Sequence, residues 1–465
     1  MKKFAEKHDL VKIAGIMVLI SVLLTWIIPQ GYFNGGELVT NDITRIGIFD
    51  FFTYGLLGIY YFYILVTFMF VLGGFYQVLS KTAGYQKLTA NMAKRFKGKE
   101  ILFTLVVSFI IAALSAVTNE YILLIACVPF FITIMKKMGL DKITAFVTTF
   151  GSILIGALGS VYSTKIVGAN VQYLSIEYNT LLWAKILMFG LTYVVFNIFT
   201  VLHIVKHKPA KDEEISDMFE ETNVTKIDKV WPLVIVLSLA ALVSIIAYLP
   251  WEEAFGITWF KTATENILAF EVFDAPIFGY ILGSVKEFGS WDIFGIQIIM
   301  LIASLIIKWI YKISLNDFIT SYGEGFKKVG KMVVLMLLSY LTLEFTAMFP
   351  VIPTIVDWII SLSDKFNVFL TTISGLLTSA FTVEYSYTVN IIGTFLTTKF
   401  ADLTDQIALI LQFTYGYVGF FIPTSAILLM GLSYLGISYK EWMKYIWKFL
   451  LIMLAIIIVL LLIIC

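Results

Sequence analysis

Long apolar stretches separated by short polar segments run along most of the chain. Many of them approach the roughly 20 residues that an α-helix needs to cross a bilayer. Inside lipid only helices and closed barrels satisfy their own backbone hydrogen bonds, so the pattern predicts an all-α polytopic membrane protein. The predicted stretches are residues 13–28, 51–79, 101–117, 121–135, 143–161, 181–205, 231–249, 293–311, 332–349, 368–396, 407–435 and 442–464.

Composition strengthens this prediction and excludes several classes of protein. Of the 465 residues, 59% are hydrophobic and 14% are charged, against roughly 25% charged in a soluble domain. A soluble enzyme, a nucleic-acid binder and a disordered chain are therefore excluded. Cys127 and Cys465 lie in apolar stretches, and with three histidines we expect no disulfide framework, no certain metal site and no cofactor.

The charges of two loops predict how the chain is oriented. Residues 81–100 carry six basic side chains against one acid, whereas residues 251–292 carry two lysines against seven acids. By the positive-inside rule the first loop is cytoplasmic and the second external. The start, MKKFAEKHDLVK, precedes an apolar run without a small-residue cleavage signature, so we expect a retained first helix. The expected location is the cytoplasmic (inner) cell membrane, with the N-terminus inside.

Two short sequences occur twice in the same order. Residues 115–121 read SAVTNEY and residues 379–385 read SAFTVEY, 264 positions later. Residues 173–178 read YLSIEY and residues 434–439 read YLGISY, 261 positions later. Five apolar stretches separate the two acidic motifs, so the copies face opposite sides of the membrane. Such an inverted-topology repeat is typical of secondary transporters.

The acidic motifs lie inside predicted hairpins. At about 1.5 Å per residue, the arms 368–381 and 386–396 reach roughly 21 and 17 Å, which is short of the roughly 30 Å hydrocarbon core. We therefore expect a re-entrant hairpin there, and by the repeat a second one at 101–135. The arms of 101–135 are longer, so two full helices remain an alternative.

The repeat also sets the expected domain organisation. The first repeat covers 1–205, with its hairpin at about 101–135 and a broken helix at about 143–170. Residues 206–230 form a cytoplasmic linker, for which a regulatory docking segment is the alternative, and 231–250 form a connector helix. The second repeat covers 251–465, with its hairpin at about 366–398 and a broken helix at about 406–435.

Small and polar residues interrupt the apolar stretch after each hairpin: GSILIGALGSVYSTKIVGAN begins at Gly151, and TYGYVGFFIPTSAILLMG begins at Thr414. Such residues free backbone groups that can line a site, or they pack helices closely. Pro423 cannot donate an amide hydrogen bond, so we predict a break near 416–423. The backbone carbonyls freed by this break would bind a small cation, such as sodium near Gly416 and Thr424. The helix beginning at Pro423 would offer its positive end to a carboxylate.

Three acids lie in apolar surroundings: Glu120, Glu344 and Glu384. An ionised carboxylate near the bilayer centre costs on the order of 3 kcal/mol even on the most lenient scale. Each must be paired, protonated, hydrated or occupied by a cation. Lys165 and Lys185 are the candidate partners. Lys165 has three open roles: neutralising an acid, replacing a bound cation, or solvation at the outer end of its helix.

These motifs give the predicted substrate or ion site. Its residues are Ser115, Thr118, Asn119, Glu120, Gly151, Ser152, Ser163, Thr164, Lys165, Glu344, Ser379, Thr382, Glu384, Tyr385, Thr414, Gly416, Pro423, Thr424 and Ser425. A proton or sodium ion is the expected coupling ion.

Several segments resemble the C4-dicarboxylate anaerobic carrier-like family, which also contains basic amino-acid antiporters, within the ion transporter superfamily. They are LLTWIIPQGYF (23–33), VLGGFYQVLSKTAG (71–84), the two acidic motifs and GFFIPTSAILLMGL (419–432). The resemblance implies two hairpins and two broken helices around a central site, elevator-type alternating access and a homodimer. This chain has Ser163–Thr164–Lys165 where an Asn-Pro pair is expected, which argues against a first-half sodium site.

The expected function is secondary active transport of a small charged solute. Two tip glutamates favour an amino acid such as arginine or ornithine, by symport or exchange, and a C4-dicarboxylate or other organic anion is the alternative. A channel is a weaker alternative, because a pore does not need two interrupted helices. An intramembrane enzyme is weaker still, because the sequence has no HExxH motif and no nucleophile with an evident histidine partner.

Overall fold

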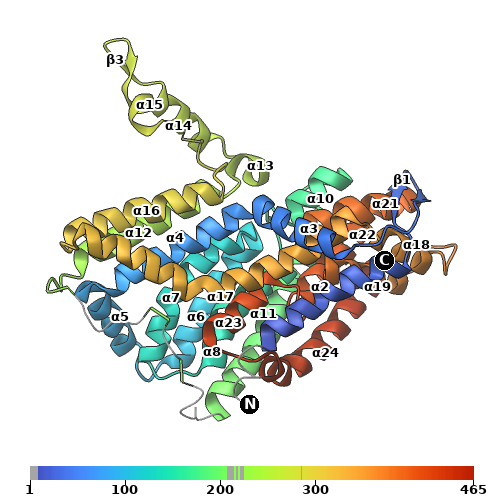
Figure 1. Ribbon diagram of the computed structural model, residues 1–465, viewed down its shortest axis with the longest axis horizontal. Coiled ribbons are helices and arrows are strands. Elements are labelled where there is room, and N and C mark those ends of the chain that lie inside the picture. Colours follow the sequence, from blue (N-terminus) through green and yellow to red (C-terminus); the bar gives the residue numbers. More distant parts are fainter. Residues whose placement is uncertain (1–8, 207–213, 216–217, 220–224, 284) are drawn as a thin grey trace. The chain divides into compact units, whose positions relative to one another are not determined.

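The computed structural model describes residues 9–206, 214–215, 218–219, 225–283 and 285–465, and it is almost entirely helical (Figure 1). The chain divides into two compact units, each discontinuous in sequence. The first is made of Met1–Tyr63, Ala93–Met218 and Gly330–Cys465, and the second of Ile64–Met92 and Phe219–Val329. Much of the expected linker 206–230 lies outside the described residues.

The first unit contains both predicted hairpins and both predicted broken helices. Its elements are α2 (Asp9–Ile27), β1 (Gly31–Asn34), β2 (Glu37–Thr40), α3 (Ile48–Tyr61), α6 (Glu100–Thr118), α7 (Tyr121–Lys137), α8 (Lys142–Phe146), the π-helical turn η1 (Val147–Gly151), α9 (Ser152–Leu158), α10 (Val167–Leu174), α11 (Leu182–Lys206), α18 (Ile352–Ile360), α19 (Val368–Phe381), α20 (Tyr385–Thr388), the π-helical turn η3 (Val389–Gly393), α21 (Thr394–Lys399), the 3-10 turn η4 (Ala401–Leu403), α22 (Thr404–Val418), α23 (Ala426–Leu435) and α24 (Tyr439–Ile464).

The second unit is smaller. Its elements are α4 (Tyr63–Ser80), most of α5 (Ala83–Arg95), α12 (Trp231–Tyr248), α13 (Trp251–Phe255), α14 (Trp259–Leu268), β3 (Glu271–Val272), β4 (Ala275–Pro276), α15 (Ile277–Leu282), α16 (Ile293–Ile310) and the first half of α17 (Leu315–Met348). The strands pair antiparallel as β1–β2 and β3–β4.

Within the described residues, eight helices are long and apolar enough to cross a membrane: α2, α4, α6, α11, α12, α16, α17 and α24. Their exposed side chains are mostly Leu, Ile, Val and Phe, as lipid requires. The chain is therefore a multi-pass membrane protein, as its hydropathy predicted.

Two predicted stretches differ from the helices observed. The stretch 51–79 is divided at Phe62 into α3 and α4, so it is not one span. The stretch 332–349 is the end of a much longer helix, α17, which begins at Leu315. Its first half carries lysines and acids, and so an apolar pattern could not reveal it.

An apolar core in the first unit holds α10 against the second hairpin. It joins Ile166 and Ala169, beside and within α10, to Phe381, Phe395 and Leu411. Residues far apart in sequence therefore hold α10 in place.

Candidate functional site

The first hairpin turns within two residues. Helix α6 ends at Thr118, and Asn119 takes a left-handed conformation with φ 47°. Asparagine tolerates that conformation better than most residues because its short polar side chain bonds locally. Glu120 follows, and α7 starts at Tyr121. The acid predicted to lie at a hairpin tip is therefore at one.

The second hairpin turns at the equivalent residues. Helix α19 ends at Phe381, Thr382 and Glu384 are extended, and α20 starts at Tyr385. The Thr382 hydroxyl donates to the Thr378 carbonyl at 2.8 Å and lies 2.5 Å from the Thr388 hydroxyl. Hydroxyls from both arms thus hold the turn.

The first broken helix is interrupted between α9 and α10. Its non-helical residues 159–166 include Ser163, Thr164 and Lys165. The Ser163 hydroxyl accepts from the amides of Ile166 and Val167 at 3.2 and 3.4 Å, and Ser160 bonds Ser163 through its own hydroxyl. These bonds satisfy amides that the start of α10 would leave open.

The second broken helix is interrupted at residues 419–425, between α22 and α23. The Ser425 hydroxyl accepts from the Leu428 amide at 3.4 Å and caps α23. The Thr424 hydroxyl donates to the Ala380 carbonyl of the second hairpin at 2.8 Å. Thr414 bonds back to carbonyls of its own helix.

Gly416 departs from the prediction that the helix unwinds there. It lies inside α22, and a Cβ at this position would lie 2.3 Å from the Leu158 Cα of α9. Its role in the structure is close packing, because only a hydrogen atom fits between the two backbones. The break begins three residues later, at Gly419, and α23 begins at Ala426 rather than at Pro423.

Equivalent contacts recur in both halves. Helix α6 packs along α9, and α19 packs along α22. The carbonyl of Ala116 accepts from the Val161 amide at 2.8 Å, and that of Ala380, 264 positions later, accepts from Thr424. Helix α10 contacts α22, while α23 contacts α8 and η1. Each break is thus tied to the hairpin that precedes it.

Both tip glutamates have protein partners. The Glu120 carboxylate lies 3.7 Å from the Lys165 ammonium, within ion-pair distance, an arrangement compatible with the first of the three predicted roles of Lys165. Lys185 instead donates to the Tyr178 carbonyl at 2.9 Å. The Tyr340 hydroxyl donates to Glu384 and lies 2.5 Å from the Tyr121 hydroxyl.

Tyr340 is a functional candidate that the sequence did not reveal. It lies on α17 and is almost fully buried. Because its proton goes to the Glu384 carboxylate, the Tyr121 hydroxyl must donate to it. One tyrosine therefore connects the tip of the second hairpin to the residue that follows Glu120. One signal in the sequence could have revealed Tyr340. It precedes Glu344 by four residues, so the two side chains share one face of the helix.

Several buried polar atoms around the hairpins have no hydrogen-bond partner within the described part of the chain. They include Asn119 Oδ1, Glu344 Oε1, Ser379 Oγ and Gln412 Oε1. The Gln412 amide nitrogen donates to the Ser160 carbonyl at 2.7 Å, which leaves its oxygen open beside the first break. Buried acceptors without donors suit a cation or a polar solute.

Other predicted site residues have structural contacts. Gly151 lies in η1, packed on Phe196, and the Ser152 hydroxyl donates to Ser108 at 2.8 Å. Ser115 donates to the Ile153 carbonyl at 2.8 Å. Tyr385 donates to Asn170 Oδ1 at 2.7 Å, which ties the second hairpin to α10.

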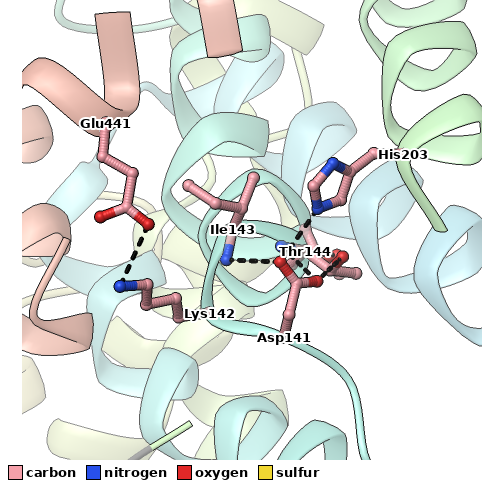
Figure 2. Close-up of polar contacts among 7 residues, drawn as sticks. Asp141, Lys142, Ile143, Thr144, His203 and Glu441 are labelled. Carbon is pink, nitrogen blue, oxygen red and sulfur yellow. Dashed lines mark hydrogen bonds and ion pairs between the residues drawn. The ribbon is translucent and has the colours of Figure 1, made fainter. Parts of the chain in front are cut away.

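A polar cluster anchors the start of the first broken helix (Figure 2). The Asp141 carboxylate caps α8 through the amides of Ile143 and Thr144 at 3.3 Å. It also accepts from the Thr144 hydroxyl, and the His203 ring nitrogen of α11 lies 2.9 Å away. Burial raises the pKa of Asp141, but the hydrogen bonds from His203 and Thr144 outweigh it, so the pKa lies below its ordinary 3.8.

We expect Asp141→Ala to lower the free energy of unfolding by about 2 kcal/mol and Asp141→Asn by about 1, because asparagine keeps the cap but loses the charge. A lowered carboxyl pKa stabilises the fold above pH 3.8, and this contribution disappears as the pH falls through the folded-state pKa. Thermal unfolding in detergent measures both effects.

Glu441→Gln is the matched control. It breaks the part-exposed Lys142–Glu441 pair of 3.0 Å, for which we expect less than about 1 kcal/mol. An equal loss in the control would contradict the role of Asp141.

Residues 8–465 match the model of the DcuC family, described as C4-dicarboxylate anaerobic carrier. No curated protein matches. The YdaH transporter of Alcanivorax borkumensis is 14% identical, with 98% of each chain covered and a TM-score of 0.42. MtrF of Neisseria gonorrhoeae, described among antimetabolite efflux pumps, is 13% identical, with 97% of this chain and 94% of that chain covered and a TM-score of 0.38.

The family match spans nearly all of the chain, including every helix of both units. It agrees with the resemblance found in the motifs and with the multi-pass helical fold. It also places the chain among transporters rather than enzymes. The chain belongs to the DcuC family, the C4-dicarboxylate anaerobic carriers, and is a secondary transporter of the membrane.

Proposed function

We propose that this protein carries a small dicarboxylate, or a closely related organic anion, by secondary active transport with alternating access. The observation that carries the proposal is the family match over residues 8–465. The geometry supports it with two interrupted helices, each bonded to the tip region of the hairpin before it.

This order of candidates reverses the one that the sequence favoured. Arginine or ornithine was preferred because two tip glutamates suit a substrate amino group. In the structure Glu120 has Lys165 nearby and Glu384 accepts from Tyr340, so neither needs a cationic substrate. A solute such as aspartate, with two carboxylates and an ammonium group, is the second candidate. Its ammonium would approach Glu120, whose carboxylate lies 3.7 Å from the Lys165 ammonium.

A dicarboxylate requires positive charge and hydrogen-bond donors. Lys165 supplies the charge from the first break, where its side chain is 54% exposed. The second break supplies the Ser425 hydroxyl, which accepts from the Leu428 amide and keeps its proton to donate, at the positive end of α23. We propose that the carboxylates of the solute displace Glu120 from Lys165 and reach the start of α23.

The recurring contacts support an inverted-topology repeat. We propose that α6–α7 and α19–α21 are re-entrant hairpins entering from opposite sides, in an elevator-type transporter with a cytoplasmic N-terminus. Helix α6 is long enough to cross a membrane, so for α6–α7 the proposal rests on the repeat. The repeats are those expected at 1–205 and 251–465, with 231–250 as connector. The family resemblance adds a homodimer to this proposal.

The coupling ion is proposed to be sodium or a proton. Asn119 and Gln412 present buried oxygens without partners, which are ligands that suit sodium. The Glu384 carboxylate is the candidate proton carrier, because the Tyr121–Tyr340 chain ends on it.

We expect proteoliposomes to concentrate radiolabelled succinate, with aspartate second and with arginine and ornithine not transported. Lys165→Gln should reduce uptake about 10–100-fold, since a hydrogen bond to a charged group contributes about 1.5–3 kcal/mol. Lys165→Arg should retain part of the activity.

Lys142→Gln is the matched control, because it removes the lysine of another Lys–Glu pair, with Glu441, and should leave uptake unchanged. Transport of arginine but not of succinate would overturn the proposed substrate class. Downhill flux without concentration or exchange would indicate a channel instead.

A further inference from the structure

Residues 250–283 and 285–292 belong to an arm that leaves the end of α12 and returns to the start of α16 (Figure 1). Both ends of the arm are bonded to the last turn of α12. The amides of Gly289 and Trp291 donate to the Ala247 carbonyl at 2.9 and 3.2 Å. The Trp251 ring donates to the Ile246 carbonyl at 2.7 Å. The arm therefore begins and ends beside one end of the α12–α16 pair.

The arm exposes large apolar side chains on its helices and at the turn between its two strands. In α14, Trp259, Ile267 and Phe270, just beyond its end, follow helical spacing along the exposed side, while Thr264 is buried on the other side. Phe273, at the turn between β3 and β4, is 98% exposed. Tyr280 in α15 is 74% exposed. An apolar surface of this kind indicates a partner.

The charges of the arm exclude an anionic partner held by electrostatics. Its sequence has two lysines against seven acids. Lys261 pairs with Glu252 at 3.1 Å, and Lys286 pairs with Asp292 at 2.8 Å. Both lysines thus form ion pairs with acids of the arm. The rest of the arm's surface is apolar, with acidic side chains between the apolar ones.

The position of the arm identifies the partner. Helices α12 and α16 are candidate membrane spans, and their exposed Leu and Ile side chains, such as Leu239 and Ile302, must face lipid. The arm begins and ends at one end of this pair. With 10 residues, α14 is about 15 Å long and cannot cross the roughly 30 Å core. An amphipathic helix that cannot span lies in the interface, where Trp and Tyr are enriched.

We propose that this arm docks on the lipid–water interface beside α12 and α16, inserting the side chains of Trp259, Phe270, Phe273, Tyr280 and Ile281 into the headgroup region. The binding is apolar and favours zwitterionic lipid. The acids, among them Glu271 and Asp274, stay at headgroup level. Docking fixes the end of the α12–α16 pair relative to the bilayer, and it does not depend on which solute is transported.

Single cysteines carrying an environment-sensitive fluorophore test the proposal. In a Cys127→Ser, Cys465→Ser background, labels go on Phe273→Cys and Ile281→Cys, with Glu265→Cys on the exposed polar side of α14 as the matched control. In nanodiscs of zwitterionic lipid that hold one copy of the protein, we expect the fluorescence emission of labels at 273 and 281 to shift to the blue. They should be quenched by doxyl lipid more than by iodide, with the reverse at 265. Anionic lipid at low salt should weaken the shift.

Quenching of all three labels by iodide would overturn the proposal. Shielding that appears only in nanodiscs holding two copies would also overturn it, in favour of a contact between copies. A second measurement avoids the cysteine changes. Brominated lipid should quench the wild-type tryptophan emission more than that of Trp259→Phe, and equal quenching of the two would count against insertion.

Discussion

Glu384→Gln should reduce transport about 10–100-fold while leaving the protein folded. Glutamine keeps an oxygen that can accept from Tyr340 but loses the charge, and a hydrogen bond to a charged group contributes about 1.5–3 kcal/mol. Tyr340→Phe should cause a loss of similar size, because it disconnects the Tyr121 hydroxyl from Glu384. Uptake into proteoliposomes at several pH values and sodium concentrations measures both.

The control for Tyr340→Phe is Tyr193→Phe. Tyr193 also donates its hydroxyl, to the Leu105 carbonyl at 2.9 Å, but it lies on α11 away from the hairpin tips. We expect near-normal uptake from it. The double variant Glu384→Gln/Tyr340→Phe should lose less than the sum of the two single losses, because both remove one interaction. Additive losses, or wild-type pH and sodium dependence in Glu384→Gln, would remove Glu384 from the coupling mechanism.

Gly416→Ala should destabilise the protein by about 1–3 kcal/mol, the usual cost of overpacking a tight core. The added methyl group would lie 2.3 Å from the Leu158 Cα and 2.6 Å from its amide nitrogen. Backbone atoms cannot rotate away as a flexible side chain can, so α9 and α22 must separate. The two breaks follow directly after these helices, and transport should fall as well.

Gly190→Ala is the matched control, since it makes the same change inside α11 where nothing lies within 4 Å of the new methyl group. It should be neutral or raise stability by up to about 1 kcal/mol, because alanine favours a helix over glycine. The midpoint of thermal unfolding in detergent distinguishes the two. Equal midpoints for both variants would show that α9 and α22 adjust without cost.

The sequence was sufficient for the helical membrane class, for both turn positions and for the existence of both breaks. Each of these depends on local chemistry. Long apolar runs form helices in lipid because a helix satisfies all of its backbone hydrogen bonds within one segment. Pro423 cannot donate an amide hydrogen bond, and with the glycines that precede it a break in the helix is favoured there. The repeat of SAVTNEY as SAFTVEY predicted that Glu120 and Glu384 lie at turns, and this too depends on local sequence.

Contacts between distant segments were decided by the tertiary structure. The sequence could not pair Tyr340 with Glu384, or Asp141 with His203, because these residues lie on separate helices whose approach depends on packing. Gly416 shows the limit most clearly. A glycine before a proline suggests unwinding, yet the neighbouring α9 holds it in a helix. Local sequence sets where a backbone is able to bend, and the side chains and backbones packed around it determine where it does.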